Sequence, residues 1–491
     1  MNTKKNLYYN IAVKGIIFLF LAAAAFLIVL RSPLNYWRNG ISGTDSSVFK
    51  YIALLISKGG MPYKDTFDHK GPLLYIYNYI GQMISYYRGI WVIELVSMFT
   101  FICISYKISR LFCGRAASCF IVIAATAPIS EYFEGGNFTE EYALPFLALG
   151  IYIFIDYFLN KNISRLRLIL CGLSFGAVLM LRANMISVWI VFCIAVLVLS
   201  IINDKKIPWN FILWFLIGAA IIIVPIFIWL IQGGAFKDFI NDYIIFNMKY
   251  SSYKERANKY NRYNSIMRFL SCNILLVSLS SLAYLLKKKV NIFFNVTYII
   301  YIIVTLLLIS MSGMSYGHYG MVLIPMFIYP LSRFESHLRQ EERNDEIIAV
   351  CLMFILTLIF ADWKSNLDNA AGAVHYSSKE NIAMSSEIKT IFDIIEENTT
   401  EDEKIIVIGN SNYFYVISKR LAASKCSYQF PVCSIDDNLK TEFINNITEN
   451  KPKIVIIDDY TQKNRMDLFA TVDAYELIYV ADEKIAVYRL K

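Results

Sequence analysis

Apolar residues occur in blocks along most of the chain, and short polar or basic loops separate the blocks. A transmembrane helix needs about 20 mainly apolar residues, and most of these blocks have about 15 to 22. The pattern predicts a mainly α fold, a polytopic membrane bundle of about eleven helices. The expected spans are 11–30, 90–109, 114–130, 142–159, 166–182, 185–202, 209–231, 266–286, 291–311, 319–333 and 346–361.

The segment 72–87 is also apolar, but it carries Asn78, Gln82 and five tyrosines. If it were a further span, most basic loops would lie outside the membrane, against the positive-inside bias. With this segment left out and the N-terminus inside, every inward loop is basic. We therefore expect interfacial helices in the first outer loop, 31–87, because tyrosine is common at the membrane surface.

The same topology places the polar tail, 362–491, outside the membrane. Short apolar runs at 404–408 and 453–457 predict buried strands, and residues 477–489 predict a closing hairpin. Strands that alternate with helices indicate a small parallel sheet. The chain is therefore expected to divide into a transmembrane domain, 1–361, and an extracytoplasmic α/β domain, 362–491.

Composition agrees with a membrane protein, because 57% of the residues are hydrophobic and only 18% are charged. A soluble domain has about 25% charged residues, so a soluble enzyme is excluded as the whole molecule. The net charge of +8 comes from Lys and Arg at the ends of apolar blocks, which are topology signals and not a nucleic-acid surface. Two of the nine cysteines, Cys426 and Cys433, lie in the polar tail and could pair.

Residues with chemical potential gather in the first outer loop. Asp45 begins a predicted helix, where it is either an N-cap or a carboxylate held at the membrane surface as a general base. Asp65, Asp68, His69 and Lys70 follow close together. They form either an ordinary turn or a site for an anionic ligand, in which His69 and Lys70 would bind a phosphate as cations.

A second outer loop, 130–141, is strongly acidic and ends in Glu140 and Glu141. Acids favour the first turn of a helix, which accounts for Glu141 and less well for Glu140. We therefore take Glu140 as a candidate catalytic carboxylate and Glu141 as a candidate substrate contact. Arg182, at the outer end of a span, either extends to the membrane surface or binds a phosphate from below.

Two later segments also have polar groups on the outer side. His318 and Tyr319 are flanked by glycines before a span that contains proline, and they are either structural or ligand contacts. The segment 236–268 is rich in Tyr, Lys and Arg. It is either a solvated loop or a lid over a sugar phosphate, with aromatic rings for the sugar and cations for the phosphate.

Together these features resemble the GT-C superfamily of membrane glycosyltransferases, in a bacterial form of the protein-mannosyltransferase and lipid A aminoarabinose-transferase branch. The resemblance rests on the order and side of short motifs. One span precedes a long outer loop with Asp45 near its start and Lys70-Gly71-Pro72 at its end. The acidic stretch 136–141 and the late pair His318-Tyr319 follow.

One residue departs from the family pattern. Family members often carry an arginine early in the second span, and the matching stretch here has Glu94. Cationic contact with a lipid phosphate must then come from elsewhere, and Arg182 and Lys70 are the candidates.

The resemblance implies a hexosyl- or pentosyltransferase in the bacterial plasma membrane. The donor would be a sugar on a polyprenyl phosphate, and the acceptor a cell-envelope glycan, lipid or protein on the outer face. In the family the first-loop aspartate is assigned as the base or the acceptor-orienting group, and Asp45 occupies that position. The second-loop acid corresponds best to Glu140 or Glu141.

The implied chemistry suits these residue types. A sugar hydroxyl is a poor nucleophile, so a carboxylate helps by taking its proton as the new bond forms. A polyprenyl phosphate leaves readily and needs cations to stabilise its growing charge. No organic cofactor is implied. The sequence leaves open a divalent cation such as Mg²⁺ or Mn²⁺, with Asp45 and Glu140 as candidate ligands.

Three other functions compete with this interpretation. They are a transporter or flippase of lipid-linked sugars, a polymerase or ligase of polyprenyl-linked glycans, and a non-catalytic partner in a glycan-assembly complex. Transporters usually have repeated halves and polar groups near the bilayer midplane. Here the sequence has no evident repeat, and its acids are expected at the outer mouth of the bundle. The sugar, the acceptor and the oligomeric state stay open.

Overall fold

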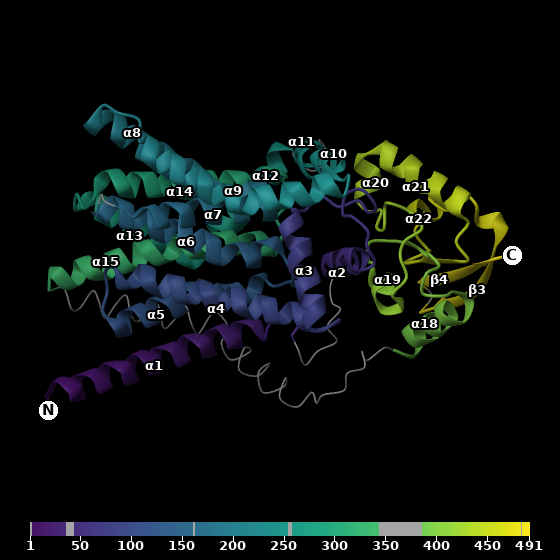
Figure 1. The fold of residues 1–491 in the computed structure, drawn as a ribbon, viewed down its shortest axis with the longest axis horizontal. Coiled ribbons are helices and arrows are strands. Elements are labelled where there is room, and N and C mark those ends of the chain that lie inside the picture. The colour runs from purple at the N-terminus through teal and green to yellow at the C-terminus, as the bar shows by residue number, and fades with distance from the viewer. Residues whose placement is uncertain (1, 36–43, 161–162, 254–257, 343–384, 483) are drawn as a thin grey trace.

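The computed structural model describes residues 2–35, 44–160, 163–253, 258–342, 385–482 and 484–491. A long helical bundle occupies one side of the molecule, and an α/β unit lies beyond one end of it (Figure 1). The elements of the bundle and its loops are α1 (Asn2–Val29), α2 (Thr44–Ser57), α3 (Pro72–Ile84), α4 (Gly89–Arg110), α5 (Arg115–Thr126), η1 (Ala127–Tyr132), α6 (Thr139–Asn160), α7 (Arg165–Leu181), η2 (Ala183–Met185), α8 (Ser187–Asp204), α9 (Trp209–Gln232), α10 (Phe236–Phe239), η3 (Ile240–Ile245), α11 (Phe246–Ser252), α12 (Lys259–Leu270), α13 (Asn273–Lys287), α14 (Ile292–Ile309), η4 (Gly317–Phe327) and α15 (Ile328–Gln340).

Six of the described helices, α1, α4, α6, α8, α9 and α14, are long and apolar enough to cross a membrane. The pair α12 and α13 would add a seventh span, but the two helices meet at 77° where the sequence predicts one continuous span. The other expected spans fall on α5, α7, η4 and α15, and the span 346–361 lies outside the described residues. The chain is a multi-pass helical membrane protein.

The bundle is tightest where α7 packs along α9. A Cβ atom built on Gly172 would lie 1.8 Å from the carbonyl oxygen of Phe215, and one on Gly218 would lie 2.0 Å from that of Ile169. Only glycine permits backbones to approach this closely, which is a common way for membrane helices to pack. The contact fixes α7, whose C-terminal end carries Arg182.

Two short helices cover the end of the bundle that faces the α/β unit. Figure 1 shows α3 crossing the direction of the long helices, as the sequence predicts for an interfacial helix. Pro72 occupies the first position of α3, where its missing N–H is no loss. The preceding Gly71 touches the end of α7, because its N–H donates to the carbonyl of Leu181 at 3.0 Å. This contact brings the first outer loop onto the end of α7.

The C-terminal unit consists of α18 (Ser386–Asn398), β1 (Ile406–Ile408), α19 (Tyr413–Ser418), α20 (Val432–Ile435), α21 (Asp437–Asn450), β2 (Ile454–Ile457), α22 (Lys463–Met466), η5 (Val472–Ala474), β3 (Tyr475–Ala481) and β4 (Ile485–Leu490). The strand order is β1-β2-β4-β3, with β1 parallel to β2 and the other two pairs antiparallel. The predicted strands and closing hairpin are confirmed. The sheet is mixed, because a hairpin turn can only join antiparallel strands.

Buried hydrogen bonds join the C-terminal unit to α2 and the first outer loop. The backbone N–H of Asn412 donates to Ser47 Oγ at 2.9 Å, and the N–H of Ala422 donates to the Tyr51 hydroxyl at 3.0 Å. Phe67 N–H donates to the carbonyl of Lys425 at 2.8 Å. These contacts hold the unit against the end of the bundle. Cys426 and Cys433 are buried free thiols in this unit.

Candidate functional site

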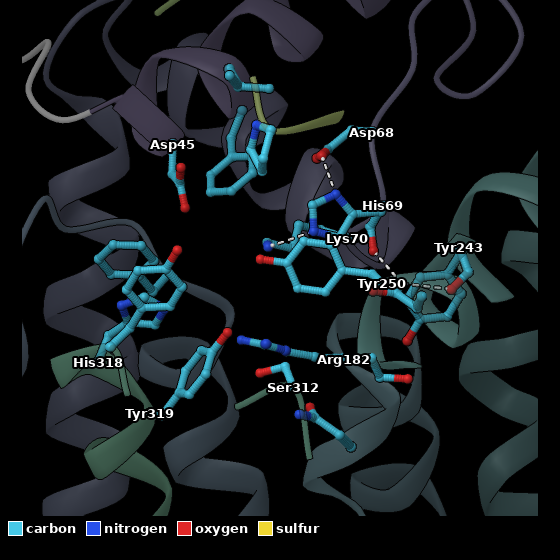
Figure 2. Close-up of a pocket in the computed structure, with 18 of the residues that line it drawn as sticks. Asp45, Asp68, His69, Lys70, Arg182, Tyr243, Tyr250, Ser312, His318 and Tyr319 are labelled. Atoms are coloured by element: carbon cyan, nitrogen blue, oxygen red, sulfur yellow. Dashed lines mark hydrogen bonds and ion pairs between the residues drawn. The ribbon is translucent and has the colours of Figure 1, made fainter. Parts of the chain in front are cut away.

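A cavity of about 700 Å³ lies between the end of the bundle and the C-terminal unit. Its walls come from α2, the first outer loop, the second outer loop, η3 with α11, and the loops after β1 and α19. In the view of Figure 2, Asp45, His318 and Tyr319 stand on one side, with His69 and Tyr250 on the other. The guanidinium of Arg182 lies between the two sides (Figure 2).

Asp45 lies in the first turn of α2 and lines the cavity. Most of α2 after this turn is buried, which fixes the helix across the bundle end. The part of the chain that the structure describes gives the Asp45 carboxylate no hydrogen-bond partner, and Figure 2 shows the carboxylate directed into the cavity. A rigid helix therefore presents an accessible carboxylate to whatever the cavity holds.

Lys70 lines the same cavity, and its backbone is held within the first outer loop. The hydroxyls of Tyr63 and Tyr75 donate to the Lys70 carbonyl at 2.7 and 3.1 Å. The Lys70 ammonium donates to His69 Nε2 at 3.2 Å. Burial lowers the pKa of His69 well below its usual value, and the nearby charges of Lys70 and Arg182 lower it further. His69 is therefore neutral at physiological pH, which corrects the expectation that it binds phosphate as a cation.

Asp68 joins the bundle to the C-terminal unit. Its carboxylate accepts the hydroxyl of Tyr75 at 2.7 Å and the hydroxyl of Tyr428 at 2.8 Å. Burial raises the pKa of Asp68 above its usual value, although Lys70 and the two tyrosine hydroxyls oppose this effect. The side chain is only 2% exposed, so its geometry is that of an interdomain contact at the cavity edge.

Arg182 lies between a carboxylate and an aromatic ring. It forms an ion pair with Glu140, and its guanidinium carbon is 4.4 Å from the centre of the Tyr319 ring. Glu140 also accepts the Thr139 hydroxyl at 2.8 Å. Ion pairing and the cation–π contact fix the guanidinium in one orientation. Arg182 reaches the cavity, whereas Glu140 is buried behind it.

A carboxylate and an imidazole form a second pair on the Asp45 side. His318 Nδ1 is 2.6 Å from Glu134 Oε2, and the N–H of Gly317 donates to Glu134 Oε1 at 2.7 Å. The His318 ring stacks on Phe138, with ring centres 3.9 Å apart. The hydrogen bond to His318 lowers the pKa of Glu134 below its usual value, more than its partial burial raises it. Glu134 is therefore ionised at neutral pH and orients the imidazole.

A buried polar network holds the second outer loop in this position. Glu94 accepts the N–H of Asn137 at 2.9 Å, and the Asn137 and Asn78 amides exchange two hydrogen bonds. Glu141 accepts the N–H of Phe138 at 3.1 Å and lies within hydrogen-bond reach of Glu94. The glutamate that replaces the family arginine thus supports a loop and does not reach a lipid phosphate in this cavity.

The cavity brings most of the residues proposed from the sequence together. Those that line it are Asp45, Asp68, His69, Lys70, Arg182, His318 and Tyr319. Three others do not line it. Asp65 is exposed and accepts the N–H of Met61 at 2.7 Å, as an ordinary turn residue does, while Glu140 and Glu141 are buried in the first turn of α6. Their site roles stay predictions, and their positions favour structural support.

Glu134, Asn410 and Tyr428 are among the cavity residues that the sequence did not indicate. Glu134 was one acid among several in the second loop, and nothing in the sequence distinguished it. Asn410 and Tyr428 come from the C-terminal unit, which was not connected to the site. The Gly-Asn turn after a strand was a usable signal for Asn410, since loops at strand ends often bind ligands.

The predicted lid segment borders the cavity on its described parts. Tyr243 and Tyr250 line the cavity, and Tyr250 stacks on His69 with ring centres 5.5 Å apart. Tyr260 and Tyr263, on α12, are exposed instead. Lys249 contacts Asp436 of the C-terminal unit at 2.9 Å, so this segment joins the bundle to that unit.

Within the described ranges, no three His, Cys, Asp or Glu side chains come together as a metal site. Asp45 and Glu140 do not converge, because Glu140 is turned toward Arg182 and Thr139. The divalent cation stays a prediction, and no step below depends on it.

Comparisons with known proteins identify the family and the fold. The model of a family described as "Putative competence-induced protein Ccs4 N-terminal domain" matches residues 3–345. No curated protein matches the sequence significantly. Among solved structures, the chain is similar to ArnT from Cupriavidus metallidurans bound to undecaprenyl phosphate, with 12% identity and a TM-score of 0.61 over 96% of this chain and 98% of that one.

A second solved structure shares the arrangement. It is the oligosaccharyltransferase AglB from Archaeoglobus fulgidus in complex with an inhibitory peptide and a dolichol-phosphate, with 12% identity and a TM-score of 0.55 over 97% of this chain and 74% of that one. At this identity the similarity shows the fold. The chain therefore has the fold of these two structures, a helical bundle with a C-terminal unit at one end.

Proposed function

The chain belongs to the Ccs4 N-terminal domain family and has the GT-C fold, and from its cavity we propose that it is an integral-membrane glycosyltransferase. It moves a sugar from a polyprenyl-phosphate donor to a cell-envelope acceptor on the outer face of the membrane. Similar folds that bind undecaprenyl phosphate and dolichol-phosphate support this choice of donor class.

The proposal rests on one observation. An accessible carboxylate and two fixed cations share a single cavity. Asp45 faces the space from α2, while Lys70 and Arg182 enter it from the first outer loop and the end of α7. A transfer from a lipid phosphate to a hydroxyl needs both kinds of group. A cavity of about 700 Å³ is within the range of ligand sites.

The chemical step is a displacement at the anomeric carbon of the donor sugar. The acceptor oxygen forms a bond to this carbon as the bond from the carbon to the phosphate oxygen breaks. Asp45 takes the proton of the acceptor hydroxyl, and the polyprenyl phosphate leaves with the bonding electron pair. A positioned base of this kind contributes about 10²- to 10⁴-fold to the rate.

The two cations stabilise the leaving phosphate. Lys70 is fixed through its carbonyl by two tyrosines, and the neutral His69 accepts one of its ammonium protons. Arg182 is fixed by Glu140 and Tyr319. Preorganised donors act without having to reorganise during the reaction. Glu140 is therefore proposed to position Arg182 instead of touching the substrate.

The basic inward loops support an extracytoplasmic position for the cavity. Lys205 and Lys206 follow α8, and Lys287 to Lys289 follow α13, both at the ends of helices remote from the cavity. The positive-inside bias assigns these loops to the cytoplasm. We place the cavity and the C-terminal unit on the outer face of a bacterial plasma membrane.

The proposal is tested by comparing cells with the wild-type chain, with Asp45→Asn, and without the protein. Mass spectrometry of the cell-envelope glycans should show a sugar substituent that only the wild type adds. Purified Asp45→Asn protein should bind undecaprenyl phosphate like the wild type. Identical glycans in all three strains, or failure of the wild type to bind the lipid, would refute the proposal.

A further inference from the structure

The carboxyl end of strand β1 opens onto the cavity. Gly409 and Asn410 follow the last residue of β1, and Asn410 lines the cavity together with Tyr428, Phe430 and Pro431. In α/β units, loops after parallel strands commonly carry ligand contacts, because the strand ends meet at one edge of the sheet. The carboxyl end of β1 is therefore part of the cavity wall, in a position where ligands commonly bind.

The Asn410 side chain has an unused hydrogen-bond acceptor. Its amide oxygen is buried and has no partner among the residues that the structure describes. Asn184 lines the cavity from the end of the bundle, and its buried amide oxygen also has no partner among the described residues. An unpaired buried acceptor costs free energy, and a ligand hydroxyl that donates to it removes that cost.

The loop that carries Asn410 is fixed next to the proposed base. Ser47 Oγ lies 3.2 Å from Ser411 Oγ and accepts the N–H of Asn412 at 2.9 Å. Ser47 is in the same first turn of α2 as Asp45. These two bonds hold the loop of Asn410 against the first turn of α2, which also carries Asp45.

Charge differs between the two walls. The four residues of the C-terminal unit that line the cavity are all uncharged. Of its nearby cations, Lys425 contacts Asp238 and Asp242 at 3.4 and 3.5 Å, while Arg465 pairs with Asp458 and covers one face of the Phe430 ring, 5.5 Å from its centre. The bundle wall, by contrast, presents Lys70 and Arg182. The bundle wall thus suits a phosphate, and the other wall suits a neutral group.

We propose that the C-terminal unit forms the acceptor subsite of this cavity, in which Asn410 and the ring of Phe430 bind a neutral, hydroxyl-bearing acceptor such as a sugar or polyol. This inference rests on the proposed function. The Asn410 amide accepts a hydrogen bond from one hydroxyl and thereby sets the orientation of the neighbouring hydroxyl toward Asp45. Phe430 offers an apolar face to the C–H groups of the acceptor.

The test uses the full chain in lipid nanodiscs and compares Asn410→Ala with Asn438→Ala. Asn438 is an exposed asparagine of the same unit, so its replacement controls for the loss of an amide. Saturation-transfer NMR measures binding of free glucose, N-acetylglucosamine, ribitol and glycerol to protein saturated with undecaprenyl phosphate. Asn410→Ala should bind the best of these probes about tenfold more weakly, as expected for one lost hydrogen bond, and Asn438→Ala should bind it like the wild type.

Two lipid probes separate the acceptor from the donor sugar, which has the same hydroxyl chemistry. Undecaprenyl phosphate and undecaprenyl phosphoryl glucose should bind Asn410→Ala and the wild type equally. Weaker binding of the phosphoryl glucose alone would assign Asn410 to the donor sugar and overturn the proposal. So would a wild type that binds none of the free probes, or an Asn410→Ala variant that binds them unchanged.

A second substitution guards against loss of folding. Asn410→Ser keeps a shorter polar group and should give an intermediate affinity at an unchanged thermal midpoint. An affinity equal to that of the wild type would count against the subsite. Failure of the proposed function would give a different result. The wild type would then not bind undecaprenyl phosphate, or Lys70→Ala would bind it as well as the wild type.

Discussion

The two outer loops both carry candidate catalytic acids in the sequence, but these acids have different roles in the structure. The first loop delivers its key carboxylate, Asp45, to the cavity, together with Lys70. The second loop buries Glu140 and Glu141, the acids that seemed most prominent, and presents Glu134 instead. Both Asp45 and Glu140 lie in the first turn of a helix, so helix position alone does not decide which acid is accessible.

The difference comes from what covers each helix start. α2 lies across the end of the bundle, and its first turn borders the cavity. α6 is long and apolar enough to span a membrane, and the acids of its first turn are buried, where Glu140 pairs with Arg182 and Glu141 accepts the N–H of Phe138. The first turn of α2 thus leaves its acid open to the cavity, whereas the first turn of α6 buries its acids.

Asp45→Asn should have the largest effect on transfer. The amide cannot accept the proton of the acceptor, so transfer should fall by about 10²- to 10⁴-fold, while undecaprenyl phosphate binding and the thermal midpoint stay unchanged. The measurement is single-turnover transfer with the purified protein. The matched control is Asp65→Asn, an exposed turn acid of the same loop, which should keep nearly full activity. Equal activity of the two variants would remove Asp45 as the base.

Glu140→Gln should have the next largest effect. The amide no longer neutralises Arg182, so the guanidinium loses its fixed orientation, and loss of one member of a buried pair costs about 3–5 kcal/mol. We expect weaker undecaprenyl phosphate binding and a higher donor KM. A fall in kcat with an unchanged donor KM would instead support the catalytic role that the sequence predicts for Glu140.

Glu134→Gln should reduce transfer by about tenfold, since it removes the charge that orients His318 but keeps a similar shape.

The thermal midpoint of the wild type should also depend on pH through Glu134. The pKa of Glu134 is lowered in the folded protein, so its stabilisation is complete above the usual value of 4.5 and is lost as pH falls below that value. Thermal midpoints of wild type and variant should therefore converge in acid. A constant difference down to pH 3 would contradict this assignment.

Glu141→Gln should have the smallest effect. The glutamine carbonyl can still accept the N–H of Phe138, and its amide can donate to Glu94, which lies within reach. The transfer rate should stay within about twofold of the wild type, and the free energy of unfolding within about 1 kcal/mol. A loss as large as that of Glu140→Gln would mean that Glu141 contacts the substrate.

Much of the fold follows from residue patterns. Apolar length predicts the spanning helices, and the polar groups Asn78 and Gln82 correctly separate α3 from the spans. The bend between α12 and α13 was not predictable, because the apolar pattern runs through residues 266–286 without a break. The mixed order of the sheet depends on how a closing hairpin joins a parallel pair, which local patterns do not specify.

The candidate site was predictable where one stretch of chain carries several reactive groups, as at Asp68, His69 and Lys70. It was not predictable where burial changes the charge of a group, as for His69, or where a distant segment supplies the wall. Asn410 is far from Asp45 in the sequence, and only the hydrogen bonds between α2 and the loop after β1 bring them together.

The family domain ends at residue 345, yet the cavity is completed by residues 410–431. Asp45, Lys70 and Arg182 thus lie within the matched family domain, whereas the opposite cavity wall lies after it in the sequence. Under the proposed function, exchanging the tail between family members would change the acceptor side of the cavity and leave Asp45, Lys70 and Arg182 in place.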